Sequence, residues 1–144
     1  GVYARDEVDV ASRQAAADVL ASGSDVLWVE REGQLDAVTG VSGSGPAYVF
    51  YFLEGLEQAA RELGFAPADA RRLAYATFAG AMALAEASEL EPAVLRAQVT
   101  SKGGTTERGI GVLDEAAVRA AFVRAVKAAA ARATELGDAA GREG

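Results

Sequence analysis

The sequence contains neither cysteine nor histidine. Without cysteine there are no disulfides, thiolate metal sites or thiol nucleophiles. Without histidine the chain has no imidazole base, no Ser-His triad of its own and none of the usual zinc ligand sets. Any chemistry must therefore use hydroxyls, carboxylates, Lys or Arg, backbone dipoles or a cofactor, and no metal site is expected.

Positive charge is also scarce, because 14 Lys and Arg stand against 21 Asp and Glu, for a net charge of -7. Sequence-independent nucleic-acid binding needs clustered cations, so nucleic acid is excluded as a partner. The longest uncharged run, residues 37–53, is too short and too broken by glycine and proline to span a membrane. With no signal peptide visible, we expect a cytoplasmic protein without a membrane partner.

The 144 residues suffice for one domain with a real core, and alanine and glycine dominate the apolar half of the composition. This favours closely packed helices over a thick aromatic core. The chain opens on Gly1 and not on methionine, which suggests that it is a fragment.

The most informative stretch is the polar segment Val99–Glu107, which lies between two apolar helical patterns. Its adjacent Gly103 and Gly104 free the backbone, so that successive N–H groups can converge. A helix that starts at Thr105 or Thr106 leaves about four amides without internal partners and presents a positive dipole end. The pattern predicts a site for a small carboxylate, and the alternative is an ordinary capped turn.

Residues 1–35 are predicted to form a strand–helix–strand unit. A strand is expected over 1–7, a helix capped by Asp9 as far as Ser22, and a second strand over 25–31. One such unit cannot make a stable sheet. These residues are therefore interpreted as the tail of a larger α/β domain, or as strands that pair with another chain.

From residue 34 onward the pattern is helical. Asp114 is predicted to cap the last helix, which Gly137 ends, and residues 138–144 are predicted to be disordered. The expected helices cover approximately 46–63, 67–88, 92–99, 106–113 and 114–136.

The expected helix 46–63 is apolar on every side in its first half, where Tyr48, Phe50, Tyr51 and Phe52 follow one another closely. A helix that is apolar all round must be buried all round, and a second subunit is the simplest cover. The glycines of the preceding segment 40–46 are interpreted as a packing point rather than a ligand site. They do not form a dinucleotide fingerprint.

Two motifs resemble those of a known family, pyrroline-5-carboxylate reductase. The segment 36–48, DAVTGVSGSGPAY, resembles the start of that family's long dimer helix. The second motif comprises Pro92, Leu95, 99–101, 103–106, Gly109, Ile110, Leu113 and Asp114 at the family's spacings. The resemblance covers most of residues 36–136, and residues 1–35 fit the end of the family's Rossmann-type domain.

The resemblance implies a mainly α fold, an interlocked helical-bundle dimerisation domain similar to the C-terminal domain of 6-phosphogluconate dehydrogenase, after a short β-α-β remnant. The implied domains are residues 1–35, the tail of the nucleotide-binding domain, and 36–144, for dimerisation and substrate binding. The implied activity is reduction of pyrroline-5-carboxylate to L-proline with NADPH or NADH, which the missing domain mainly holds. The implied partner is a second copy of the chain, with a higher oligomer left open.

The resemblance also implies site residues. The substrate carboxylate is assigned to the loop residues Ser101, Gly103, Gly104, Thr105 and Thr106. Thr106 is the candidate catalytic residue, as proton donor or polariser of the ring nitrogen, and helix capping is its alternative role. Glu89 is a further candidate for the substrate and Gln98 for the cofactor; an exposed surface carboxylate is the alternative for Glu89.

Two features depart from the family pattern. Lys102 stands where many relatives have proline, and no glycine-rich strand-to-helix turn is present to hold a pyrophosphate. The fragment is therefore expected to be inactive alone. The competing hypothesis is a non-catalytic helical homodimerisation module, in which the glycine loop only caps a helix.

Overall fold

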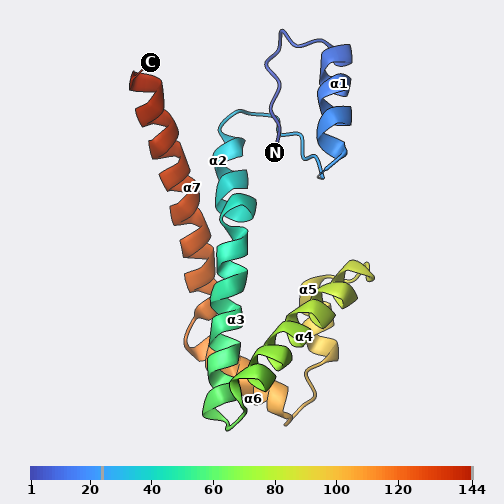
Figure 1. Cartoon of the computed structure of the whole chain (residues 1–144), viewed down its shortest axis with the longest axis vertical. Coiled ribbons are helices and arrows are strands. Elements are labelled where there is room, and N and C mark those ends of the chain that lie inside the picture. The colour runs from blue at the N-terminus through green and yellow to red at the C-terminus, as the bar shows by residue number, and fades with distance from the viewer. Residues whose placement is uncertain (24, 144) are drawn as a thin grey trace. The chain divides into compact units, whose positions relative to one another are not determined.

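The computed structural model describes residues 1–23 and 25–143, and within them the chain is mainly helical (Figure 1). Two compact units are present. The terminal unit combines Gly1–Gly45 with the segment from Val123 onward, and the central unit is Pro46–Phe122. The elements are α1 (Val10–Ala21), α2 (Gln34–Val38), the π-helical segment η1 (Thr39–Gly43), α3 (Gly45–Glu62), α4 (Pro67–Glu86), α5 (Pro92–Gln98), α6 (Thr105–Glu115) and α7 (Val118–Glu143).

The predicted β-α-β unit does not form, and this prediction was wrong. In the described part of residues 1–35 the strands are reduced to one parallel bridge between Val2 and Trp28. The Val2 N–H donates to the Leu27 carbonyl and the Val29 N–H to the Val2 carbonyl, each at 2.9 Å. A strand pair without further neighbours is marginal, which explains why a single bridge remains.

Helix α1 between the bridge residues agrees with its prediction. The Asp9 carboxylate accepts a hydrogen bond of 2.7 Å from the Ser12 backbone N–H, as an N-cap does. This hydrogen bond lowers the pKa of the Asp9 carboxyl. Because the folded-state pKa is depressed, the cap contributes stability at neutral pH and loses it as the pH falls through that lowered value.

Gly40 is the point where two segments of the terminal unit approach most closely. It is buried in η1, and a Cβ on it would lie 2.8 Å from the Ala130 nitrogen of α7. The Thr134 hydroxyl donates to the Asp36 carboxylate at 2.8 Å and ties α7 to α2 one turn away. Figure 1 shows α2 beside the same stretch of α7. The predicted packing role of the glycine segment is thus confirmed at Gly40.

The central unit begins with α3 and α4, which the short connection 63–66 joins. Gly64, at φ +97°, ends α3, and the Phe65 N–H reaches back to the Ala60 carbonyl at 3.1 Å. The buried apolar residues among those described are few: Leu53 on α3, and Ala70 and Ala74 on α4. A small core of this kind leaves large apolar side chains of the same helices exposed.

An aromatic cluster joins α3 to the first turns of α7 inside the central unit. The Phe122 ring lies 5.4 Å from the ring of Tyr48, edge to face, and 5.7 Å from that of Phe52. Such pairs contribute about 0.5–1.5 kcal/mol beyond the area they bury. The cluster packs the first turns of α7 against α3.

The C-terminal part of the chain corrects two predictions. Asp114 does not cap the last helix; it lies inside α6, and Ala117 makes the turn to α7 at φ +51°. Helix α7 also continues through Gly137 to Glu143, so the predicted disorder of 138–143 was wrong. One glycine costs a helix only about 1 kcal/mol, and the alanines around it are strong helix formers. Gly144 lies outside the described residues.

Among the described residues, no helix is long and apolar enough to cross a membrane.

Candidate functional site

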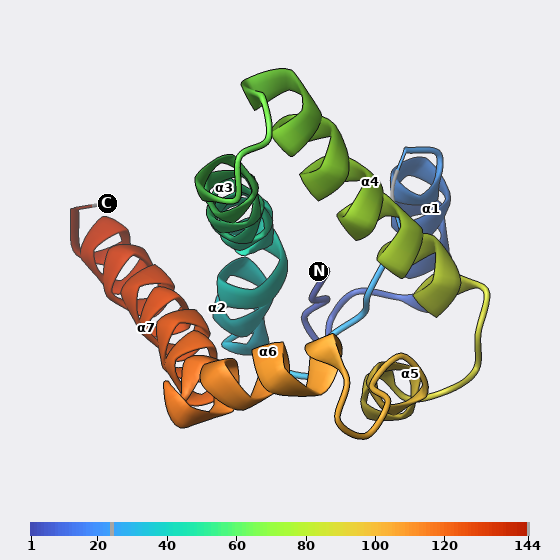
Figure 2. The same ribbon diagram turned by 90° about the horizontal axis from the view of Figure 1, so that it is seen from below.

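The loop that joins α5 to α6 lies at the edge of the central unit (Figure 2). Helix α5 closes where the Thr100 hydroxyl donates to the Arg96 carbonyl at 2.6 Å and the Thr100 N–H to the Ala97 carbonyl at 3.1 Å. Gly103 then takes φ +73°, a left-handed conformation that favours glycine. This turn directs the chain into the first residues of α6.

Two of the predicted carboxylate donors are already used within the protein. The Gly104 N–H donates to the Ser101 carbonyl at 3.0 Å, and the Gly103 N–H donates to the Glu107 carboxylate at 2.7 Å. These amides shape the loop and are not open to a ligand in this conformation. The sequence argument missed Glu107, although a glutamate in the first turn of a helix often returns to a preceding amide.

The next amides are free. Among the described residues, no hydrogen-bond acceptor is found for the N–H groups of Thr105, Thr106 or Glu107, which open α6. The N-cap residue is Gly104, which has no side chain with which to cap them. The Thr105 and Thr106 side chains are exposed. Of the amides predicted to bind a carboxylate, those that remain open belong to the first turn of α6.

A hollow of about 300 Å³ opens beside this turn. Gly103 and Gly104 contribute its loop side, and Arg108 adds a cationic side chain. Its remaining lining residues are Glu107 and Gly111. A hollow lined by one guanidinium and one carboxylate suits a small polar ligand better than an apolar one.

A side chain at Gly104 would crowd Ser101. A Cβ there would lie 2.5 Å from the Ser101 hydroxyl oxygen and 3.0 Å from the Ser101 carbonyl oxygen. Ser101 is thus placed against Gly104, and its carbonyl holds the turn. The two residues act together in shaping the loop.

The two remaining candidates lie outside this turn. Glu89 is exposed in the connection between α4 and α5, and no hydrogen bond or ion pair of its carboxylate is found among the described residues. Gln98 is exposed at the last residue of α5. The loop and these side chains are not joined by a direct contact that would define one site.

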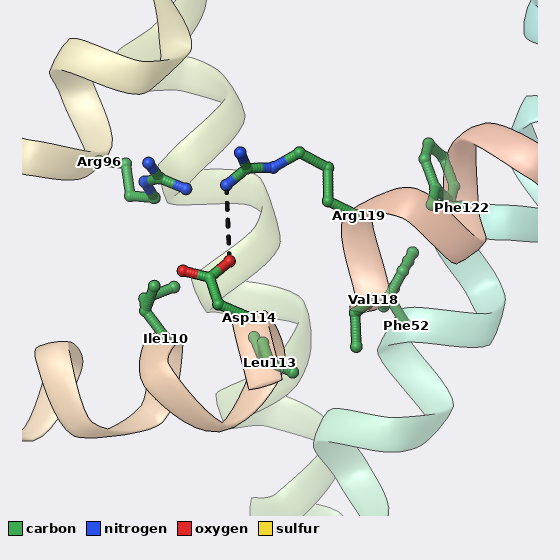
Figure 3. A pocket seen from close by; sticks show the side chains of 8 residues that line it. All are labelled: Phe52, Arg96, Ile110, Leu113, Asp114, Val118, Arg119 and Phe122. Carbon is green, nitrogen blue, oxygen red and sulfur yellow. Dashed lines mark ion pairs between the residues drawn. The ribbon is translucent and has the colours of Figure 1, made fainter. Parts of the chain in front are cut away.

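A second hollow, of about 250 Å³, lies between α3, α5, α6 and α7 within the central unit (Figure 3). Apolar residues dominate its lining, and Phe52 and Phe122 contribute from the aromatic cluster. On one side Arg119 pairs with Asp114 at 3.8 Å, and the Arg96 guanidinium lies nearby. Sequence reasoning did not find this hollow, because its lining comes from four helices whose crossing no local pattern gives.

The described residues do not form a nucleotide cradle. The helix that follows the bridge residue Val2 is α1, and Asp6, Glu7 and Asp9 precede it. Carboxylates at that helix start would repel a pyrophosphate, which needs glycine amides there. The described chain also has no group of three or more acidic side chains that could hold a metal ion.

The comparisons with known proteins show the family to which the chain belongs. Residues 32–136 match the family model described as pyrroline-5-carboxylate reductase dimerisation. The chain belongs to the pyrroline-5-carboxylate reductase dimerisation family. The match covers η1, the whole central unit and most of α7, so the family's segment contains the loop, the hollow beside it and Gly40.

Similar curated proteins are named pyrroline-5-carboxylate reductase. The chain is 40% identical over 142 residues to the pyrroline-5-carboxylate reductase of Pseudomonas aeruginosa. This alignment covers 99% of this chain and 52% of that protein. It is 44% identical over 130 residues to that of Corynebacterium melassecola, covering 90% of this chain and 48% of that protein. The chain therefore spans about half the length of these relatives.

Solved structures show the same fold. A pyrroline-5-carboxylate reductase from Coxiella burnetii superposes with a TM-score of 0.87 at 39% identity, over 93% of this chain and 50% of that one. A Plasmodium falciparum pyrroline carboxylate reductase, solved with NADP bound, gives 0.83 at 26% identity, over 92% and 50%. The mainly helical arrangement is thus that of the reductase family.

Proposed function

We propose that this chain is the dimerisation and substrate-binding half of a pyrroline-5-carboxylate reductase, which reduces 1-pyrroline-5-carboxylate to L-proline. The observation that carries the proposal is the open first turn of α6, where the Thr105 and Thr106 amides have no hydrogen-bond acceptor among the described residues. Their chain neighbours Gly104 and Glu107 line a hollow with charged side chains. The family match over residues 32–136 supports the same assignment.

The role of this turn is to hold the substrate carboxylate. Two adjacent amides at a helix start present parallel donors and the positive end of the helix dipole. A hydrogen bond to a charged group contributes roughly 1.5–3 kcal/mol before ordering costs. Two such bonds suit a metabolite that must bind and leave quickly. Arg108, which lines the hollow, adds attraction for the same charge.

Thr106 is proposed as the residue next to the reacting nitrogen. Its side chain is exposed at the second residue of α6, inside the turn that is proposed to hold the carboxylate. From there it can donate a hydrogen bond to the ring nitrogen and polarise the C=N bond. Glu89 and Gln98 are proposed as lesser contacts with substrate and cofactor.

Replacing Thr106 with alanine is expected to lower kcat of the full-length reductase about tenfold or more, since a positioned proton donor contributes about 10²–10⁴-fold. Thr106→Ser keeps the hydroxyl and is expected to retain most of the activity. Steady-state kinetics with both variants make the test. Equal activity of Thr106→Ala and the unchanged enzyme would remove Thr106 from the chemistry.

The hydride for this reduction comes from NADPH or NADH, which residues outside this chain are proposed to hold. In the longer protein, residues 1–35 are proposed to be the tail of the nucleotide-binding domain. The bridge between Val2 and Trp28 supports this, because both residues keep parallel pairing without a sheet. Alone, the chain would then bind the substrate without reducing it.

The partner is proposed to be a second copy of the chain, held through interlocked helices. On α3, Phe50 is 58% and Tyr51 is 73% exposed, which is unusual for neighbouring aromatics in a protein with so small a buried core. Their position inside the family's dimerisation segment supports a homodimer interface. The proposal is also compatible with an assembly of several such dimers.

Sedimentation at micromolar concentration is expected to give a dimer. Tyr51→Asp places a charge in the proposed interface and is expected to shift the equilibrium toward monomer at least tenfold, since burying an unpaired charge is costly. Val10→Asp is the control, because Val10 is 83% exposed but lies outside residues 32–136. A monomer in the unmodified chain would contradict the proposal.

The second candidate function is a homodimerisation module without catalysis. The observation that favours it is the hydrogen bond from Gly103 to Glu107, which explains part of the loop as a helix cap without any ligand. The two functions differ in one measurable respect. Only the reductase hypothesis requires the Thr105 and Thr106 amides to respond to a small carboxylate.

A further inference from the structure

Among the residues that the structure describes, Glu107 is the acidic side chain that reaches into the proposed carboxylate loop. Its carboxylate accepts a hydrogen bond of 2.7 Å from the Gly103 N–H and lines the hollow beside α6. An anion next to a site for anions needs an explanation, because like charges repel. The Glu107 carboxylate either competes with the substrate carboxylate for the amides or positions the loop that binds the substrate.

We infer that Glu107 is a positioning residue, which holds Gly103 so that the next amides stay directed at the substrate carboxylate. This inference rests on the proposed function. The Gly103 N–H points back to the third residue of α6 only while Gly103 keeps φ +73°. The contact therefore closes a small ring around Gly104, the residue that leads into the free amides of Thr105 and Thr106.

The hydrogen bond between Gly103 and Glu107 matters because two adjacent glycines are flexible. Gly103 and Gly104 have more accessible backbone conformations than any other pair of residues, and ordering them costs free energy. If the loop is ordered only part of the time, the apparent affinity falls by that fraction. A charge-assisted bond from Glu107 keeps the ordered fraction high before the substrate arrives.

The same geometry argues against direct competition. The Gly103 amide donates to Glu107 and the Gly104 amide donates to the Ser101 carbonyl. Neither of these amides is one that the proposal assigns to the substrate carboxylate. The free donors belong to the residues that follow. The internal carboxylate and the substrate carboxylate would thus use separate amides of one turn, and Arg108 beside them offsets part of the repulsion.

The test is a titration of the isotope-labelled chain with L-proline, followed by NMR at the amides of Thr105 and Thr106. Glu107→Ala is expected to raise the Kd about three- to tenfold, as loss of one partly exposed charge-assisted bond would. Glu107→Gln keeps an acceptor oxygen and is expected to stay within about twofold. Glu115→Ala, on the exposed far end of α6, is the matched control and is expected to leave Kd unchanged.

A spectroscopic signature accompanies the affinities. The Gly103 amide proton is expected downfield in the unmodified chain and in Glu107→Gln, and to move upfield in Glu107→Ala. If Glu107→Ala does not fold, Glu107→Asp takes its place, since it keeps the charge but withdraws it by one methylene and is expected to weaken binding similarly.

The outcomes separate the two proposals. Unchanged or tighter binding in Glu107→Ala, with normal binding in the unmodified chain, overturns the positioning role alone. No response of Thr105 and Thr106 to L-proline in the unmodified chain overturns the proposed function, and the inference about Glu107 with it.

Discussion

Replacing Gly104 with valine is expected to lower kcat/KM of the full-length reductase about a hundredfold, or about 2.7 kcal/mol, which is within the range of one charge-assisted hydrogen bond to the substrate. The physical reason is space. A Cβ at Gly104 already meets the Ser101 hydroxyl at 2.5 Å and the Ser101 carbonyl at 3.0 Å, and valine adds two methyl groups. Because that carbonyl accepts the Gly104 N–H, the turn must open and α6 loses its present start. Steady-state kinetics across substrate concentration measure the effect.

Gly109→Ala is the control for this prediction. Gly109 lies on the same helix, and a Cβ there meets no heavy atom within 4 Å. It is expected to leave kcat/KM unchanged. The quaternary structure of both variants should match the unmodified protein, since the loop is separate from the exposed aromatics of α3. Normal kcat/KM in Gly104→Val would show that the loop does not bind the substrate.

Gly40→Ala is expected to destabilise the protein by about 1–3 kcal/mol, the usual cost of adding atoms to a packed contact. The new Cβ would lie 2.8 Å from the Ala130 nitrogen and 2.9 Å from the Ala130 Cβ. These are backbone and Cβ atoms of a long helix, so no side-chain rotation relieves the contact. In thermal denaturation, a change of this size lowers Tm by about 3–10 °C for a chain of this length.

Gly43→Ala is the matched substitution, three residues away at the end of the same π-helical segment. Its Cβ would meet the Thr39 methyl at 3.6 Å, an ordinary contact. Stability is expected to stay the same or rise slightly, because alanine favours helical backbone more than glycine does. Equal Tm changes in the two variants would contradict the assignment of Gly40 as the contact between η1 and α7.

Local signals predicted most of the helices. Asp9, Gly64, Pro67 and Pro92 mark helix ends by their own chemistry, and each lies at or next to an observed end. Asp114 and Gly137 gave equally good signals and were misleading. The aromatic cluster around Phe122 positions the start of α7, and neighbouring alanines carry that helix through Gly137; neither effect is visible in a short window of sequence.

In the loop, too, local sequence signals predicted some features, and contacts between residues decided the others. Paired glycines before two threonines predicted a helix start with free amides, and the open N–H groups of Thr105 and Thr106 agree with it. Which amides stay free was not predictable, since it depends on Ser101 and Glu107 taking the others. The strands failed for a different reason: Val2 and Trp28 have the right residues and the right pairing, but no neighbours to extend it.

The most direct test of the central claim is a crystal structure of this chain grown or soaked with L-proline. The account predicts the proline carboxylate within hydrogen-bond distance of the Thr105 and Thr106 nitrogens, with its ring nitrogen toward the Thr106 hydroxyl. Proline bound elsewhere at good occupancy, with the first turn of α6 empty, would contradict it and leave a helical pairing module.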